Sequence, residues 1–327
     1  MWTRRQFALG AAAAALPLAG VQAQAQAQPY PSRPIRLLVP FAPGGAPDVV
    51  ARVLAQQLGQ QMGQSVVVDN KPGGNSIVAT EAVAKAAPDG YTLLFATSSH
   101  TINPFVYKKL PFDAFADFAP VALLKRTPGL VLVAGPGTQA RDLKAFIAEA
   151  RGGKLAFGSP GVGNPQQLPG EQLNIMAGTK MLHVPYRGGN LALNAVVSGE
   201  IACAFVSVIS AKGPLEAGQV RALAVTGTQR LSALPNVPTI AESGVAGYDM
   251  DGGWQGVLAP VGTPADVVQR LSAEIHKAVR AAPVAARIRE DDSEPLGSTP
   301  QEFDRFLRAD ATRMKSIVQA VGIRIDS

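Results

Sequence analysis

The run IRLLVPFAPGGAPD, residues 35–48, decides the fold class, because it joins a short apolar strand to the start of a helix. Residues 35–39 are apolar apart from one arginine, which is typical of a strand buried on both faces of a sheet. Residues 48–62 then repeat apolar side chains at helical spacing. Gly44 and Gly45 lie between the two elements, where the backbone can come close to a ligand or simply make a tight turn.

The same alternation of strand and helix recurs along the chain. Apolar runs at 66–68 and 92–96 predict two further strands, with a helix over 76–86 between them. The pattern restarts at 130–133 and continues to a strand at 222–226. The sequence therefore predicts an α/β protein with two lobes, each a mostly parallel sheet flanked by helices.

The chain should cross between these lobes twice. The first crossing is expected near residues 125–130, and the Gly/Pro-rich segment 227–253 should carry the chain back. We therefore assign residues 29–127 plus 248–327 to lobe 1 and residues 128–247 to lobe 2. Two crossings leave a cleft and allow hinge motion.

Residues 1–28 have the pattern of a secretory signal. Arg4 and Arg5 precede a weakly apolar run that is too short to span a bilayer, and Gln/Ala repeats follow with cleavage expected between about Ala23 and Gln28. The pair of arginines fits a twin-arginine export signal or an ordinary one. We expect a periplasmic protein that is not embedded in the membrane once cleaved.

Composition argues against several classes of function. The chain has a formal charge of +6, but only 6% of its residues are aromatic and its basic residues are scattered, so nucleic acid is a poor partner. Cys203 is the single cysteine and the three histidines lack metal-ligand spacing, so neither a disulfide framework nor a metal site is expected. Gln166 stands where a dinucleotide fingerprint needs its third glycine. We expect no cofactor and no catalysis.

Candidate binding residues follow the strands, because ligands in open α/β sheets bind beyond the carboxyl ends of strands. In the first lobe these are the turn at 40–48 and a predicted loop at 97–103 with adjacent serines, Ser98 and Ser99. Asp48 falls in the first helical turn, where a carboxylate also suits the helix dipole. In the second lobe the run 158–164 precedes a helix, and Arg187 could pair with a carboxylate or lie free on the surface.

Several motifs in fixed order resemble the periplasmic receptors of tripartite tricarboxylate transporters, the Bug family. The resemblance spans the whole mature chain and rests on YPSRPIR at 30–36, VPFAPGG at 39–45, NKPG at 70–73, APDGYTLL at 87–94 and HVPYRG at 183–188. It implies a two-lobed fold of the type II periplasmic-binding-protein class. It also implies a small organic-acid ligand in the cleft and delivery to transporter membrane subunits. We expect the receptor to be a monomer.

The resemblance also implies which residues hold the ligand. In lobe 1 it points to Phe41, Ala42, Gly44 and Gly45, helped by Ser98 and Ser99, and in lobe 2 to Ser159, Gly161 and Asn164. With Asp48, Arg187 and Ser207, these residues make up the predicted site.

The sequence departs from the family pattern at two places. Ala46 and Pro47 replace a hydroxyl residue that many members carry, and acids that many members have near Ala202 and Val206 are absent. Without such an acid a ligand amine would lack a partner, so a carboxylate without an amino group is favoured. Two other functions stay open at this stage: a ligand-loaded partner of a membrane sensor, and a secreted hydrolase using Ser98 or Ser159 with a histidine.

Overall fold

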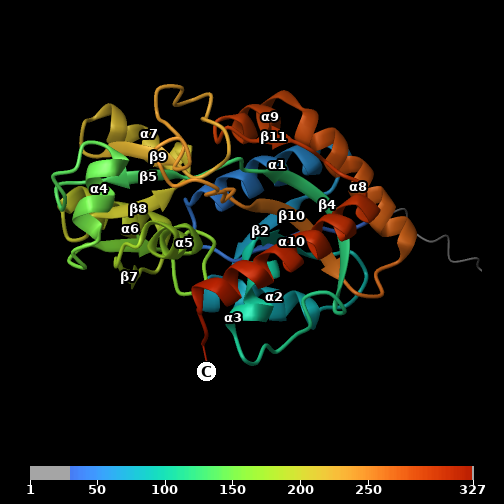
Figure 1. Cartoon of the computed structure of the whole chain (residues 1–327). Coiled ribbons are helices and arrows are strands. Elements are labelled where there is room, and N and C mark those ends of the chain that lie inside the picture. The colour runs from blue at the N-terminus through green and yellow to red at the C-terminus, as the bar shows by residue number, and fades with distance from the viewer. Residues whose placement is uncertain (1–29, 326–327) are drawn as a thin grey trace, which may run out of the picture. The chain divides into compact units, whose positions relative to one another are not determined.

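Two sheets make up the framework of the computed structural model, which describes residues 30–325 (Figure 1). The six-stranded sheet of lobe 1 has the order β11-β4-β10-β3-β1-β2, and the five-stranded sheet of lobe 2 has the order β7-β6-β8-β5-β9. The strands of lobe 1 are β1 (Ile35–Val39), β2 (Val66–Asn70), β3 (Thr92–Thr97), β4 (Phe118–Arg126), β10 (Trp254–Pro260) and β11 (Glu294–Pro295). Those of lobe 2 are β5 (Val131–Ala134), β6 (Ala156–Ser159), β7 (Leu182–Pro185), β8 (Cys203–Val206) and β9 (Arg221–Val225).

Helices cover both faces of each sheet. Figure 1 shows α1, α8 and α9 on one side of the lobe 1 sheet and α2, α3 and α10 on the other. The helices of lobe 1 are α1 (Ala46–Met62), the short η1 (Gly74–Ser76), α2 (Ile77–Ala84), α3 (Ser99–Val106), α8 (Ala265–Arg280), α9 (Ala282–Arg289) and α10 (Pro300–Val321). Those of lobe 2 are α4 (Leu143–Ala150), α5 (Leu168–Ala177), α6 (Gly189–Ser198) and α7 (Val208–Glu216).

The two-lobed α/β fold is confirmed, but the sheets are mixed rather than mostly parallel. In lobe 1, β10 runs antiparallel to both β3 and β4, and in lobe 2, β5 runs antiparallel to both β8 and β9. The reason lies in the crossings. Since β10 and β5 each enter a sheet from the other lobe, they must run away from the cleft, against the strands whose carboxyl ends face it. Apolar runs alone do not reveal this direction.

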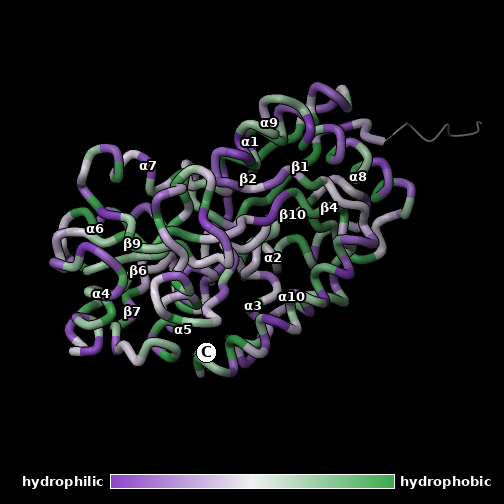
Figure 2. Tube along the Cα trace, turned by 45° about the horizontal axis from the view of Figure 1, so that its top comes forward, coloured by the Kyte–Doolittle hydropathy of each residue, from purple (hydrophilic) through white to green (hydrophobic). Residues whose placement is uncertain are grey.

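Alternating side chains fill the core on the two faces of each sheet. In lobe 2, Leu132 and Phe205 pack toward α4 and α5, while their neighbours Val131 and Val206 pack toward α6 and α7. Figure 2 shows apolar segments along the interior strands and polar ones along outer turns. Pro31–Ser327 forms one compact unit. The predicted signal, 1–28, lies outside the described residues, and among residues 30–325 no helix combines the length and apolarity needed to cross a bilayer.

Candidate functional site

The turn after β1 is held by a buried carboxylate. Asp48 is 1% exposed, and its Oδ2 accepts hydrogen bonds from Gly44 N at 2.8 Å and from Arg52 Nε at 2.9 Å. Its Oδ1 accepts from Asn70 Nδ2 at 2.7 Å, and the same amide nitrogen donates to Phe41 O at 3.0 Å. The carboxylate therefore holds the predicted turn at Gly44 directly and at Phe41 through the amide of Asn70. Asp48 faces its own loop in this structure, as a support for the residues around it.

Burial raises the pKa of the Asp48 carboxyl, but the hydrogen bonds from Arg52, Gly44 and Asn70 outweigh it and hold the pKa below its usual value. The carboxylate is thus charged at neutral pH. Gly44 has φ of 84°, a left-handed conformation that favours glycine. Ala42 and Gly44 are exposed, and Phe41 and Gly45 are half-buried.

Ser98 and Ser99 begin a helix, whereas the sequence predicted a loop over 97–103. Ser98 is the N-cap residue of α3 and Ser99 its first residue. The sequence did not indicate a helix here, because the first residues of α3 are mostly polar and show little apolar periodicity. Ser98 Oγ accepts a hydrogen bond from Trp254 N at 2.8 Å, and Ser99 Oγ donates to Asn75 Oδ1 at 3.1 Å. Both serines are buried at the end of β3.

The strands of lobe 2 bring their own predicted residues to one edge. β6 pairs in parallel with β7 and β8, so the residues after these strands lie along the same side of the sheet. Ser159 ends β6 and is buried, Arg187 follows β7 and is exposed, and Ser207 caps α7 by accepting from Ser210 N. The side chain of Ser207 thus serves as the N-cap of α7. Arg187 has no polar partner among the described residues.

Ser159 and His183 lie close enough for a hydrolase pair but lack the rest of such a site. Ser159 Oγ is 2.7 Å from His183 Nε2, within the distance that a nucleophile and base require. However, Ser159 Oγ donates its proton to Gly161 O at 2.8 Å, so His183 Nε2 is the donor to Ser159. Within residues 30–325 no side chain orients the other ring nitrogen. The pair therefore holds the 159–161 turn, and burial lowers the pKa of His183 to about 4.

Asn164 organises the turn into α5 and reaches the other lobe. Its Oδ1 accepts from Gln166 N at 3.0 Å, and its backbone N donates to Gly161 O at 3.3 Å. Its Nδ2 donates to Asn75 Oδ1 at 3.3 Å. The predicted loops of the two lobes are therefore joined by Ser99, Asn75 and Asn164 in one chain of hydrogen bonds.

Asn75 was missed by the sequence reasoning. It lies in η1 with φ of 48°, and its own Nδ2 donates to Asn103 Oδ1 at 2.8 Å. The signal that could have found it is Gly73-Gly74-Asn75, because asparagine is among the few residues besides glycine that tolerate left-handed turns.

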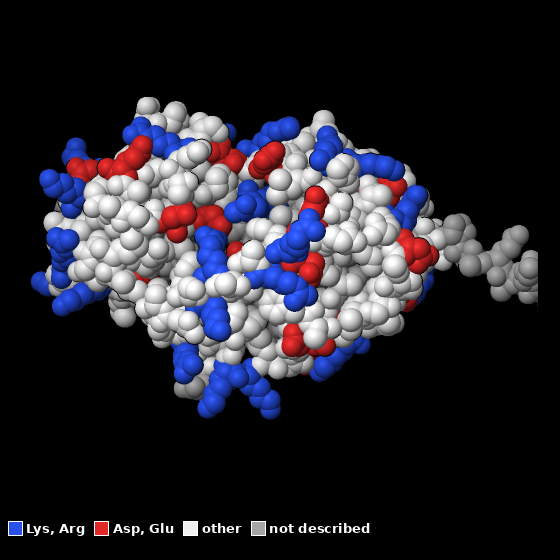
Figure 3. All heavy atoms as spheres, turned by 45° about the vertical axis from the view of Figure 1, so that its right-hand side comes forward, with Lys and Arg blue, Asp and Glu red and all other residues white. Residues whose placement is uncertain are grey.

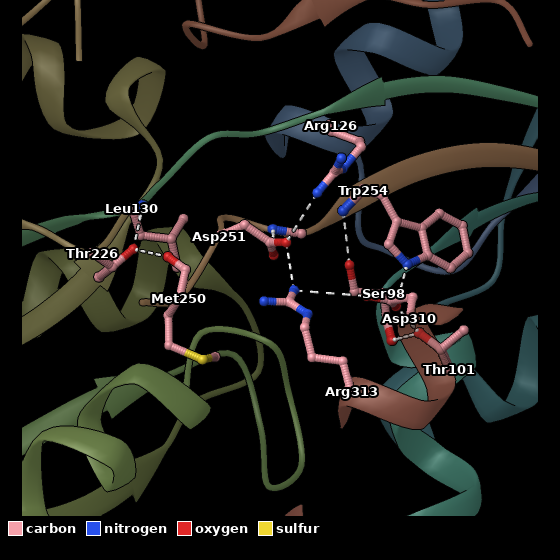
Figure 4. A network of polar contacts seen from close by, with 11 residues as sticks. Ser98, Thr101, Arg126, Leu130, Thr226, Met250, Asp251, Trp254, Asp310 and Arg313 are labelled. Atoms are coloured by element: carbon pink, nitrogen blue, oxygen red, sulfur yellow. Dashed lines mark hydrogen bonds and ion pairs between the residues drawn. The ribbon is translucent and has the colours of Figure 1, made fainter. Parts of the chain in front are cut away.

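A polar network lies beside the crossings (Figure 4). Asp310 of α10 accepts from Thr101 Oγ1 at 2.6 Å and from Trp254 Nε1 at 2.9 Å. Asp251, on the returning crossing, pairs with Arg313 and lies 3.8 Å from Arg126. Burial raises the pKa of the Asp310 carboxyl, although its two donors act in the opposite direction.

Cavities among the described residues include one between the lobes and one within lobe 2. A small one of about 10 Å³ lies between the lobes, lined by Ser98, Pro165, Asp251 and Asp310 among others, and has room for about one water molecule. A larger one of about 380 Å³ lies within lobe 2, lined by residues such as Arg141 and Asn236, away from the predicted loops. The lobes thus touch beside Ser98 and at the contact between Asn75 and Asn164.

The surface carries both signs of charge. Figure 3 shows basic side chains next to acidic ones rather than one uniformly basic face. Within residues 30–325 no three His, Cys, Asp or Glu side chains gather as a group that could hold a metal ion.

This fold, with two α/β lobes, two crossings and helices that begin after the strands of each sheet, is that of a two-lobed solute-binding protein. The chain belongs to the tripartite tricarboxylate transporter family of receptors, whose family profile matches residues 50–323. It is 37% identical over 292 residues to a UPF0065 protein of Pseudomonas sp. (strain P51), covering 88% of this chain and 86% of that protein. It is 33% identical to the protein BugT of Bordetella pertussis, covering 94% of this chain and 95% of BugT.

A solved structure agrees. R. palustris Rpa4515 with adipate has a TM-score of 0.86 and 33% identity, covering 90% of this chain and all of the other. The resemblance found in the sequence motifs is thereby confirmed, and the chain is a receptor of the transporter class. Nothing in the comparisons supports a membrane-sensor partner or a serine hydrolase.

Proposed function

We propose that the protein binds a small organic acid with at least one carboxylate between the turns at 41–45 and 159–164. The observation that carries this proposal is the chain of hydrogen bonds through Ser99, Asn75 and Asn164, which joins the helix starts of both lobes. That a similar receptor was solved with adipate supports a carboxylate as the ligand class.

Main-chain and hydroxyl donors would hold the acid. The first turn of α1 leaves N–H groups without helical partners, and these favour an anion, as do the partial positive charges at the start of a helix. Gly44 N is already used by Asp48, and Pro47 has no N–H, so Gly45 and Ala46 are the available donors there. Ser98 can donate to the ligand, because its oxygen only accepts from Trp254 N. In lobe 2, Gly161 and Asn164 would supply further donors, and Arg187, which is exposed after β7, would supply a cation.

The ligand has no amino group in this proposal. Many family members carry acids near Ala202 and Val206, and in this chain these two residues are 3% and 2% exposed and pack in the core of lobe 2. An ammonium group placed there would lose its hydration without gaining a counter-charge, which is costly.

The cellular role follows from the family. We propose export through the signal at 1–28, cleavage between about Ala23 and Gln28, and action in the periplasm as a monomer that hands its ligand to transporter membrane subunits. The receptor binds its ligand without changing it.

A thermal-shift screen over mono-, di- and tricarboxylates tests the proposal. At a hundredfold excess over Kd a ligand stabilises the folded form by about 2.7 kcal/mol, which raises the midpoint by several degrees. Asn164→Ala should weaken the response, whereas Asn236→Ala, an exposed asparagine of the same lobe, should leave it unchanged. A screen in which no carboxylate moves the midpoint, or in which a bound acid is turned over, would contradict the proposal.

A further inference from the structure

Two buried polar atoms at the cleft edge of lobe 1 have no hydrogen-bond partner. They are Oγ1 of Thr97, the last residue of β3, and Oε1 of Gln255, the second residue of β10. Each residue is 8% exposed. The register pairs Thr97 directly with Gln255, so the two side chains leave the same face of the sheet as neighbours.

This pair adjoins the proposed binding turn. β1 and β3 are parallel with Leu38 beside Leu94, and continuing that register by three residues brings Phe41 level with Thr97. Ser98 follows Thr97 directly in the chain. Thr97 therefore lies between the turn after β1 and Gln255, because β3 is the strand between β1 and β10.

The nearby charge is already balanced. Lys125 on β4 is the other cross-strand neighbour of Gln255, and its Nζ is 2.6 Å from Asp291 Oδ2. The lysine is 1% exposed. The pair Thr97 and Gln255 is thus a neutral polar patch, and a ligand group that meets it does so through hydrogen bonds rather than through a counter-ion.

The two atoms require a group of particular chemistry. Leaving a buried polar atom without a partner is destabilising, so such atoms in native proteins point to a missing partner. With the amide oriented as in the structure, Gln255 Oε1 needs a donor, whereas Thr97 Oγ1 can donate or accept. An ionised carboxylate can accept from Thr97 but has no proton for Gln255. A hydroxyl can donate to Gln255 Oε1 and accept from Thr97 at once.

We propose that Thr97 and Gln255 are further ligand-contacting residues that select an acid carrying a hydroxyl over the unsubstituted acid of the same length. This inference rests on the proposed function, in which an organic acid binds at the turn beside them. It adds two specificity-determining side chains that the sequence motifs do not mark.

Isothermal titration with succinate and malate, which differ by one hydroxyl, tests the inference; adipate and 2-hydroxyadipate replace them if the screen favours the longer chain. Wild type should bind the hydroxylated acid about tenfold more tightly, the worth of roughly one hydrogen bond. Gln255→Leu and Thr97→Val should remove that preference, while Thr97→Ser should keep it. Gln61→Leu is the matched control, since Gln61 Oε1 is equally without a partner but lies at the other end of α1.

The outcomes separate the two proposals. If plain and hydroxylated acids bind wild type equally, or if the preference survives in both variants, the pair is structural and this inference is wrong while the receptor function stands. If no organic acid binds wild type at all, the proposed function fails first. Circular dichroism and the thermal midpoint of each variant show whether a lost preference reflects lost folding.

Discussion

At the scale of single residues, the carboxylate of Asp48 is a charged group with three hydrogen-bond partners in the proposed site. It is charged, buried and bonded to a backbone N–H, a guanidinium and an amide. Loss of this carboxylate would remove the acceptor that these three donors share, and only the carboxylate itself is fully buried. The shape of the turn at 41–45, to which we assign the ligand, therefore depends on a side chain that is directed at its own loop.

Asp48→Ala should lower the free energy of unfolding by about 1–3 kcal/mol, because it leaves the amide of Asn70 and the N–H of Gly44 without acceptors. It should also weaken ligand binding, since the turn loses its fixed shape. Asp69→Ala is the control: its pair with Arg36 is largely exposed and contributes at most about 1 kcal/mol. Urea unfolding of both variants measures the difference, and equal losses would show that the Asp48 contacts are not special.

The lowered pKa values of two buried histidines lead us to expect that the free energy of unfolding depends on pH. Burial lowers the pKa of both His100 and His183 to about 4, below the ordinary value of 6.5. The unfolded chain therefore takes up these protons at a higher pH than the folded one. The free energy of unfolding should be independent of these groups above pH 6.5 and should fall as the pH drops from 6.5 towards 4.

Urea midpoints at pH 7.5, 6 and 5, together with NMR titration of the histidine rings, check this. His100→Gln should make the decline shallower, because one of the two buried rings no longer contributes. A stability that stays flat between pH 7.5 and 5 would mean that the rings are protonated equally in both states.

At the scale of elements, the hinge is a close contact between backbones. Thr127 N donates to Gly253 O, and Gly252 N donates back to Thr127 O, each at 2.8 Å, so the two crossings are bonded to each other. A Cβ on Gly227 would come within 2.3 Å of Pro128 O, and one on Gly129 within 2.9 Å of Gly227 N. The glycines allow the two crossings to touch.

Gly227→Ala should therefore destabilise the protein by more than about 2 kcal/mol, because one crossing must move away from the other. Gly213→Ala is a matched control in helix α7, where nothing lies within 4 Å of the added carbon, and it should stabilise by about 0.5–1 kcal/mol. Thermal midpoints of the two variants should move in opposite directions. A Gly227→Ala midpoint equal to that of wild type would show that the crossings can separate without cost.

The sequence predicted elements where apolar pattern and burial agree. The strand Ile35–Val39 has the predicted bounds, and the strands predicted at 92–96 and 222–226 are each within one residue of β3 and β9. It did not predict α3, whose first residues are hydroxylic, or the reversed direction of β10 and β5, which depends on how the chain crosses between lobes. The candidate site shows the same limit: turns with glycine were found, whereas Asn75, Thr97 and Gln255 matter only through neighbours distant in sequence.

At the scale of the whole molecule, α10 connects the lobes as the crossings do. Its first half packs in the core of lobe 1 through Phe303 and Leu307, while Met314 and Val318 pack with residues of α5 in lobe 2. Asp310 lies between these halves and is bonded to Thr101 and Trp254 of lobe 1. A separation of the lobes would therefore have to disrupt the packing of Met314 and Val318 against α5, while the bonds of Asp310 lie within lobe 1.

The contact of Asn75 with Asn164 offers a direct test of closure. Asn75→Cys with Asn164→Cys should allow a short bifunctional thiol reagent to join the lobes, because the two side chains meet at 3.3 Å in the closed form. The native Cys203 should not compete, since it is fully buried and burial raises its pKa, which leaves little reactive thiolate. Cross-linking should run faster with a ligand from the screen present, and the joined protein should hold that ligand without exchange. Each single variant serves as the control, because it cannot join the lobes. Exchange as fast in the joined protein as in the free one would show that the ligand enters and leaves without any movement of the lobes.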